Sequence, residues 1–347
     1  MEPLTFVSRP CLGKIPVTDT SRDFLTIQYL SKNFVLIDRT QTISTPFEFN
    51  VKDQYKILHD VQSANFSFKQ ACQKSATAIS DYAGARKIYI FWSGGIDSTL
   101  VIASFLLAGV DASNIVIVCN QESIQENPKF WKNIVSEKFS CVSTDEFFLK
   151  YKTVLPQGVL VEANPADTTF GDFDLKIAPN RLVDTLTAAP EASNLVKHYT
   201  SLHPAIPLNR IEKSIDIVNK TVSGSPAPIT TMFDWLRWVN INFIWMSVNE
   251  SLRSRVHAQS DTFYFFNAPA MQKWASKNVS VDYIVNKYYK HVLMKETIFE
   301  VFEDSDYFDN KIKWPSVSRR FLNRSALFST TNQHYYIAKE FENFLTV

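Results

Sequence analysis

The segment from residue 91 to residue 99, Phe-Trp-Ser-Gly-Gly-Ile-Asp-Ser-Thr, carries residue types that suit the binding of an anion. Gly94 and Gly95 let the backbone turn tightly and bring its N–H groups against a ligand with no Cβ in the way. Hydroxyl groups come from three neighbours: Ser93, Ser98 and Thr99. A helical pattern follows, so a helix N-terminus would add unpaired N–H groups and a positive dipole end. The segment therefore predicts a site for an anion such as pyrophosphate.

Asp97 stands inside this segment. A carboxylate beside phosphate is unfavourable unless a divalent cation bridges the two, and Mg²⁺ prefers oxygen ligands. Asp97 is therefore a predicted Mg²⁺ ligand. The alternative is a plain strand-to-helix turn in which Asp97 only stabilises the first turn of the helix. The segment is not a Walker A loop, because no Gly-Lys-Ser/Thr follows the first glycine at the required spacing, and it is not a GxGxxG motif.

Strand and helix patterns alternate around this segment. Compact apolar runs predict buried strands, and segments of helix length separate them. The predicted strands cover residues 87–92, 114–119, 139–143 and 158–162, and the predicted helices cover residues 66–82, 96–107 and 128–138. This alternation predicts an α/β fold, with a parallel sheet and helices on both of its faces.

The chain divides into three parts by pattern. Residues 1–62 are predicted to form a small β-rich N-terminal segment, with strands over 24–30 and 34–38. Residues 63–180 hold the α/β pattern and the anion-binding segment. Residues 181–347 are predicted to be mostly helical. The helices expected there cover residues 230–258, 268–277, 281–301 and 335–345.

Composition limits the classes of function. Lys plus Arg (36) nearly cancels Asp plus Glu (35), so the net charge of +1 provides no overall field that would attract nucleic acid or a membrane surface. The four cysteines show no CxxC spacing, which excludes a zinc ribbon and disfavours a disulfide framework. Neither a signal peptide nor a membrane-spanning stretch is expected. We expect a cytoplasmic protein with reduced cysteines, and its oligomeric state, a homo-oligomer included, stays open.

The sequence Ser-Gly-Gly-Ile-Asp-Ser-Thr after a hydrophobic strand resembles the pyrophosphate loop (PP-loop) of the N-type ATP pyrophosphatases. The resemblance implies an adenine nucleotide alpha-hydrolase-like, Rossmann-like fold, with ATP and Mg²⁺ as cofactors and 63–180 as the ATP-binding domain. It also implies that an acceptor oxygen attacks the α-phosphate of ATP, which gives an adenylated intermediate and PPi, and that a nucleophile then displaces AMP. The residues implied to bind ATP are Ser93, Gly94, Gly95, Asp97, Ser98 and Thr99.

Asn120 follows the second predicted strand, together with Ser123 and Glu126. These positions fall at the carboxyl edge of the predicted sheet, where open α/β sheets bind ligands. The family places adenosine contacts nearby, so the resemblance makes Asn120 a candidate ATP contact. The alternative is an ordinary loop.

Three later stretches are similar to the synthetase domain of asparagine synthetases and β-lactam synthetases. In residues 159–172, Asp167, Phe170 and Gly171 match a strand followed by Gly-Glu-Gly-Ser-Asp-Glu-Leu-Phe-Gly-Gly, which implies that Asp167 joins Asp97 in holding Mg²⁺. Residues 266–276, followed by residues 289–296, resemble a passage ending in Lys-x-x-Leu-Arg. Residues 310–316 resemble Arg-x-Lys-x-x-Phe, which implies a catalytic lysine at the phosphates: Lys311 by spacing, or Lys313. The alternatives are a helix-capping role for Asp167 and a solvated basic surface for the lysines.

The chain also departs from that group. Asn164 and Thr168 stand where asparagine synthetases have glutamates, one of which serves the amidation half-reaction, so ammonia as nucleophile is in doubt. Glu162 would need a different alignment register to replace the glutamate of the amidation half-reaction. Residue 2 is Glu rather than the cysteine that glutamine-hydrolysing members expose, and the region before Ser93 is too short for their amidotransferase domain.

The function that these observations favour is an ATP-dependent, AMP- and PPi-forming ligase of the asparagine-synthetase-like type. Its partners would be a small-molecule acceptor, expected to be a carboxylate, and an amine nucleophile, bound with the help of the mostly helical part. One alternative is a PP-loop enzyme that modifies a nucleotide or tRNA, although the chain lacks basic excess and a cysteine cluster. Another is an ATP-binding protein that has lost turnover.

Overall fold

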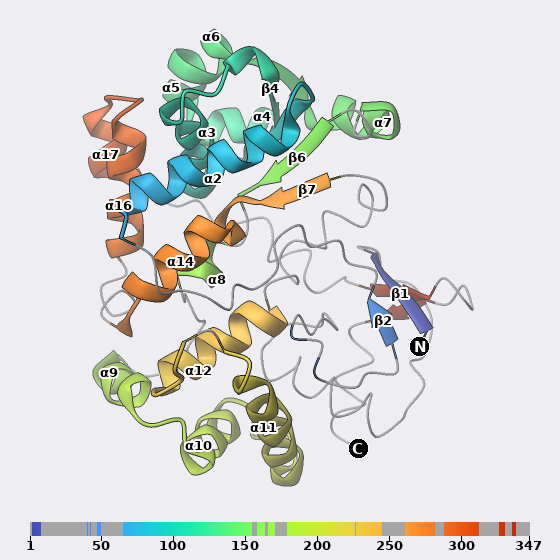
Figure 1. The fold of residues 1–347 in the computed structure, drawn as a ribbon, viewed down its shortest axis with the longest axis vertical. Coiled ribbons are helices and arrows are strands. Elements are labelled where there is room, and N and C mark those ends of the chain that lie inside the picture. The colour runs from blue at the N-terminus through green and yellow to red at the C-terminus, as the bar shows by residue number, and fades with distance from the viewer. Residues whose placement is uncertain are drawn as a thin grey trace. The chain divides into compact units, whose positions relative to one another are not determined.

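The computed structural model describes residues 2–7, 40, 42, 47–49, 65–154, 158–163, 166–170, 179–225, 227–244, 261–281, 288–311, 326–329 and 335–337. The chain forms two compact units (Figure 1). We call residues 52–170 and 256–316 the sheet unit. Residues 1–51, 171–255 and 317–347 make up the second unit.

The sheet unit is built on a five-stranded parallel sheet, which confirms the predicted α/β fold. Its strands, in spatial order, are β5 (Ser140–Ser143), β4 (Ile115–Cys119), β3 (Lys87–Phe91), β6 (Gly158–Glu162) and β7 (Asp261–Tyr264). The three innermost strands are rich in Ile and Val, as expected of parallel strands with both faces covered.

The order of the strands reverses at β3. From β3 the chain goes to β4 and β5 on one side, and then returns to β6 on the other side of β3. The register pairs Ile90 of β3 with Val161 of β6, so the segments that follow these two strands leave the same edge of the sheet. Such a reversal opens a crevice at the carboxyl ends of the strands, and ligands of open α/β folds bind there.

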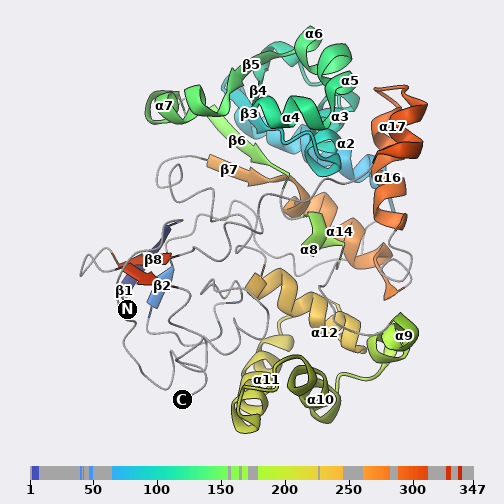
Figure 2. The same cartoon turned by 180° about the vertical axis from the view of Figure 1, so that it is seen from behind.

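Helices cover both faces of the sheet (Figures 1 and 2). Ile88 and Ile90 are buried on the face against which α2 and α3 pack. Phe147 of α7 packs on the opposite face, with its ring centroid 5.5 Å from that of Tyr89 and 5.2 Å from that of Phe91. The alternation of side chains along β3 therefore places this strand between two packed layers.

The helices of the sheet unit have these bounds: α2 Phe68–Ala83, α3 Ile96–Leu107, η1 Ala112–Asn114, α4 Gln121–Glu126, α5 Pro128–Phe130, the π-helix η2 Trp131–Val135, α6 Ser136–Lys138, α7 Thr144–Val154, α8 Ala166–Thr169, η5 Phe265–Asn267, α14 Pro269–Asn278, α16 Tyr288–Phe299 and α17 Ser305–Asn310. Ser67 starts α2 with a capping box, in which Gln70 N donates to the Ser67 hydroxyl and Ser67 N donates to the Gln70 side chain. The apolar side chains of α3 are buried from Ile96 to Phe105.

The second unit contains a small sheet and a group of helices. Its strands, in the order β2-β1-β8-β9, are β2 Phe47–Phe49, β1 Glu2–Val7, β8 Ala326–Ser329 and β9 Tyr335–Ile337. Its helices are α9 Pro179–Thr187, α10 Ala192–Leu202, α11 Leu208–Val222, α12 Met232–Val239 and the π-helix η4 Asn240–Ile244. None of the helices in the described ranges combines the length and the apolar character that crossing a bilayer would require.

Two predictions of local structure need comment here. The helix predicted over 335–345 is wrong at its start, because Tyr335–Ile337 is a strand that pairs antiparallel with β8. Its aromatic and β-branched residues favour a strand wherever a partner edge is present. The strands predicted over 24–30 and 34–38 lie outside the described residues.

The strands β6 and β3 are closely packed at Gly158. A Cβ at this position would lie 2.6 Å from Cε2 of Tyr89 and 2.9 Å from the carbonyl oxygen of Lys87. We expect Gly158→Ala to lower the free energy of unfolding by about 1–3 kcal/mol, as measured by urea denaturation, because the sheet must shift to admit the methyl group.

The control is Gly224→Ala, where the nearest atom to the added Cβ would be the Thr221 carbonyl oxygen at 3.5 Å. That change should stay within about 0.5 kcal/mol. An equally small effect at Gly158 would contradict the packing described.

Candidate functional site

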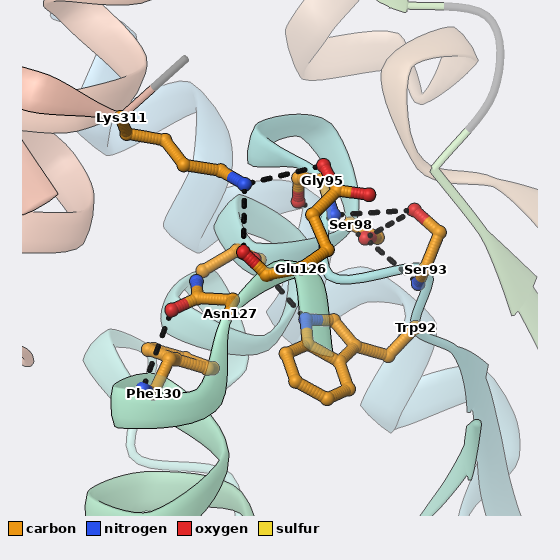
Figure 3. A network of polar contacts seen from close by, with 9 residues as sticks. Trp92, Ser93, Gly95, Ser98, Glu126, Asn127, Phe130 and Lys311 are labelled. Atoms are coloured by element: carbon orange, nitrogen blue, oxygen red, sulfur yellow. Dashed lines mark hydrogen bonds and ion pairs between the residues drawn. The ribbon is translucent and has the colours of Figure 1, made fainter. Parts of the chain in front are cut away.

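The candidate site is the loop between β3 and α3, residues 92–95, which we call the phosphate loop. Hydrogen bonds within the loop fix its shape. Ser93 N donates to Ser98 Oγ at 3.1 Å, Ser98 Oγ donates to Gly95 O at 3.1 Å, and Gly95 N donates to Ser93 Oγ at 3.3 Å. The two serine hydroxyls are 3.1 Å apart (Figure 3). Ser93 and Ser98, predicted as ligand donors, thus also bond to the loop itself.

Thr99 holds the loop from inside. Its side chain is fully buried, and its hydroxyl accepts a hydrogen bond of 3.1 Å from the indole Nε1 of Trp92. Trp92 N in turn donates to Val118 O of β4. The sequence predicted a direct ATP contact for Thr99, but its burial gives the side chain a part in positioning the loop.

The N-terminus of α3 has no side-chain cap, because Gly95 occupies the N-cap position. The first-turn N–H groups of a helix have no intrahelical partner, and together with the helix dipole they attract an anion. Asp97 is the acidic residue of this first turn and is partly buried. A bound anion would take the place of the missing cap, and Asp97 would then lie within one helical turn of it.

Gly94 joins the loop to α4. Its φ of 77° is in the left-handed region, which favours glycine. A Cβ at Gly94 would lie 2.3 Å from Ser123 O and 2.8 Å from Cβ of Glu126. The backbone of α4 and the loop therefore approach as closely as they do only because residue 94 has no side chain.

Asn120, predicted to contact ATP, is the N-cap of α4. Its Oδ1 accepts hydrogen bonds from Ser123 N at 2.9 Å and from Ser123 Oγ at 2.7 Å. The side-chain oxygen is thus used in starting the helix that packs on the loop. A capping Asn directly after a strand is a common local signal, and it competed with the functional interpretation of this residue.

Lys311, the C-cap of α17, pairs with Glu126 of the helix that packs on the loop. Its Nζ lies 3.2 Å from Glu126 Oε1 and 3.0 Å from Glu126 O, a contact between residues 185 positions apart in the chain (Figure 3). The Lys311 side chain is 9% exposed and that of Glu126 is 19% exposed. The structure therefore brings the predicted lysine to Glu126, in the helix that packs on the predicted loop; the catalytic role of Lys311 stays a prediction.

Two residues near Lys311 were not singled out from the sequence. Lys295 of α16 donates to Phe308 O at 2.6 Å, and burial, with the charge of Lys311 adding to it, lowers the pKa of Lys295. Burial also raises the pKa of Tyr307, where the Thr99 hydroxyl opposes the shift and the charges of Asp97 and Glu126 add to it. The phenol of Tyr307 is therefore within electrostatic reach of Asp97 and Glu126. Neither Lys295 nor Tyr307 belongs to a local sequence motif from which its place near Lys311 could have been predicted.

Asp167 lies in α8, which follows β6. The helix is fixed within the sheet unit by Thr169, whose hydroxyl donates to Phe266 O at 3.0 Å, and by Phe170, whose ring contacts those of Phe68 and Trp274. Since β6 adjoins β3, the segment that contains Asp167 leaves the same edge of the sheet as the phosphate loop. Lys313 and Asn164 lie outside the described residues.

Within the described ranges, no group of three or more His, Cys, Asp or Glu side chains could hold a metal ion alone. That is compatible with Mg²⁺ bound through one or two carboxylates and substrate phosphates, which is its usual mode in nucleotide sites. The residues fit a Mg²⁺ ion bound together with phosphate, because the uncapped first turn of α3 can bind the phosphate and Asp97 stands in the same turn.

Comparison with known proteins adds no family to this description, since no protein-family model matches the chain and no curated protein is significantly similar to it.

The two loop glycines should respond differently to alanine. Gly94→Ala combines a left-handed φ with overlap of a backbone oxygen, so we expect a loss of about 2–4 kcal/mol in urea denaturation. Gly95 has a φ of −70°, which alanine adopts freely, and its Cβ would meet only Ser93 Oγ at 3.2 Å and Glu126 Oε1 at 3.6 Å.

Gly95→Ala should therefore lower the free energy of unfolding by less than about 1 kcal/mol. The affinity of the Gly95→Ala variant for pyrophosphate, measured by calorimetry, should fall because the methyl group stands in the space beside the N-terminus of α3. Equal stability of the two variants would show that α4 does not pack on the loop as described.

Proposed function

We propose that this chain is an ATP-dependent ligase of the asparagine-synthetase-like type, which adenylates an acceptor and releases PPi. One observation carries the proposal. A glycine-containing loop joins β3 to the uncapped N-terminus of α3 at the point where the sheet order reverses, and a lysine from a distant part of the chain pairs with Glu126, whose side chain lies beside that loop. A positive helix end and a buried cation suit a group that leaves with negative charge.

Each residue has a role in this proposal. The first-turn N–H groups of α3 bind the β,γ end of ATP, and the serine bonds of the loop keep these donors in position before the substrate arrives. Lys311 offsets the charge that develops on PPi. Asp97, with Asp167 as second ligand by resemblance, would hold Mg²⁺. When bound, this ion would neutralise charge on the leaving phosphates.

The acceptor and the nucleophile rest on the family resemblance alone. We propose a small-molecule carboxylate as acceptor and an amine as nucleophile, so that a carbon–nitrogen bond forms. The cytoplasm is the proposed location, in keeping with Cys72, Cys119 and Cys141, which are free thiols in the described part of the chain.

The test uses α-labelled ATP with Mg²⁺ and a screen of carboxylate acceptors and amines. The wild-type chain should form labelled AMP, and acceptor-dependent exchange of PPi into ATP should appear. Asp97→Asn should lower AMP formation by roughly 10²-fold or more, because a group that acts on transition-state charge is removed. Chelation of Mg²⁺ should abolish it.

The control is Asp145→Asn, which alters an exposed carboxylate in the first turn of α7. It should keep wild-type activity. Release of ADP and orthophosphate would refute the mechanism. Binding of ATP with no AMP formed under any acceptor would favour a protein that has lost turnover, and binding of tRNA that weakens steeply with salt would favour the tRNA-modifying alternative.

A further inference from the structure

The side chain of Glu126 occupies the space next to the phosphate loop. Its Oε1 lies 3.6 Å from the position that a Cβ on Gly95 would take, and its own Cβ lies 2.8 Å from the corresponding position on Gly94. Gly95 is the N-cap of α3, so this carboxylate stands at the helix end that a phosphate would approach. A carboxylate is itself an anion that such a helix end attracts.

Lys311 holds this carboxylate in place. The ammonium group contacts both the Glu126 carboxylate, at 3.2 Å, and the Glu126 carbonyl oxygen, at 3.0 Å (Figure 3). Because both side chains are mostly buried, solvent screens this pair less than it would screen a surface pair. The cation that would meet the phosphates is therefore already paired with an internal anion.

We propose that Glu126 acts as an internal competitor of the polyphosphate, so that the ligand must displace its carboxylate from both the loop and Lys311 before it is fully bound. This inference rests on the proposed nucleotide site. Like charges cannot share the space beside Gly95, and the carboxylate must rotate away as phosphate enters. Lys311 then exchanges one anionic partner for another, which links its position to occupancy of the loop.

The opposite role is physically reasonable and predicts the opposite sign. If Glu126 served only to position Lys311 for the ligand, removal of its charge would release the lysine and weaken binding. The competitor role predicts stronger binding, because a like charge is removed from the site. The direction of the change in affinity therefore decides between the two.

The experiment measures binding of inorganic pyrophosphate, and of ATP with Mg²⁺, by calorimetry. Glu126→Gln keeps the shape of the side chain and removes its charge, and we expect it to bind pyrophosphate roughly tenfold more tightly than the wild type, the size of effect that one close like charge has on a neighbouring ionisation. Glu122→Gln is the matched control, since Glu122 is an exposed glutamate of the same helix, and it should stay within about twofold of the wild type.

Thermal unfolding gives a second readout. Without ligand, Glu126→Gln should unfold at a lower temperature than the wild type, because Lys311 loses the negative charge of the Glu126 carboxylate and keeps only neutral partners. Added pyrophosphate should raise the unfolding temperature of this variant more than that of the wild type. If Glu126→Gln does not fold, Glu126→Asp replaces it. The shorter side chain withdraws the carboxylate from Gly95 and should give a smaller gain in affinity of the same sign.

The outcomes separate this inference from the proposed function. Tighter binding by Glu126→Gln or Glu126→Asp supports the competitor role. If the wild type binds and the substitutions leave its affinity unchanged or lower it, the competitor role is overturned. The proposed ATP site is not affected by that result. Failure of the folded wild type and the folded variants to bind pyrophosphate or ATP overturns both.

Discussion

The close approach of α4 to the loop at Gly94 is the contact on which the rest of the site depends. With Ser123 O at the place where a side chain would begin, the loop and the helix can meet only through a residue without a Cβ. The approach sets the position of the last turn of α4 and hence of Glu126. Glu126 in turn receives Lys311 from α17. A backbone constraint at one residue thus sets, through two helices, the position of the ion pair between Glu126 and Lys311.

The sheet order explains why these parts meet. Because β3 is central and the order reverses beside it, the loops after β3 and β6 leave the same edge, and α4 begins directly after the neighbouring strand β4. Chain segments far apart in sequence therefore meet at one edge of the sheet. The buried hydroxyl groups of Ser98 and Thr99 bond to the Gly95 carbonyl oxygen and to the Trp92 indole, which holds the loop in one conformation and reduces the reorganisation that a ligand would require.

Much of the sheet unit was predictable from the sequence, because buried parallel strands appear as continuous apolar runs and α3 as an apolar segment of helical length. The predicted helix over 96–107 matches α3, and the four predicted strands match β3 to β6 within a residue. The fifth strand, Asp261–Tyr264, was not predicted; it is short, and what makes it a strand is its pairing with β6. Asn120 and Thr99 stay predicted ATP contacts, and the hydrogen bonds that their side chains make could not be predicted from residue types alone. The pairing of Glu126 with Lys311 left no local signal, because it depends on the tertiary fold.

The indole of Trp92 gives the loop an optical property of its own. Its ring is stacked on that of Trp131 in the π-helix η2, with centroids 6.1 Å apart and planes inclined by 15°, while its N–H is bonded to Thr99 in the first turn of α3. Two indoles in this arrangement couple their electronic transitions, so a small rotation of the loop alters the near-ultraviolet circular dichroism of the pair. The chain thereby contains an intrinsic chromophore at the spot where its chemistry is proposed to begin, and motion there is visible without a label.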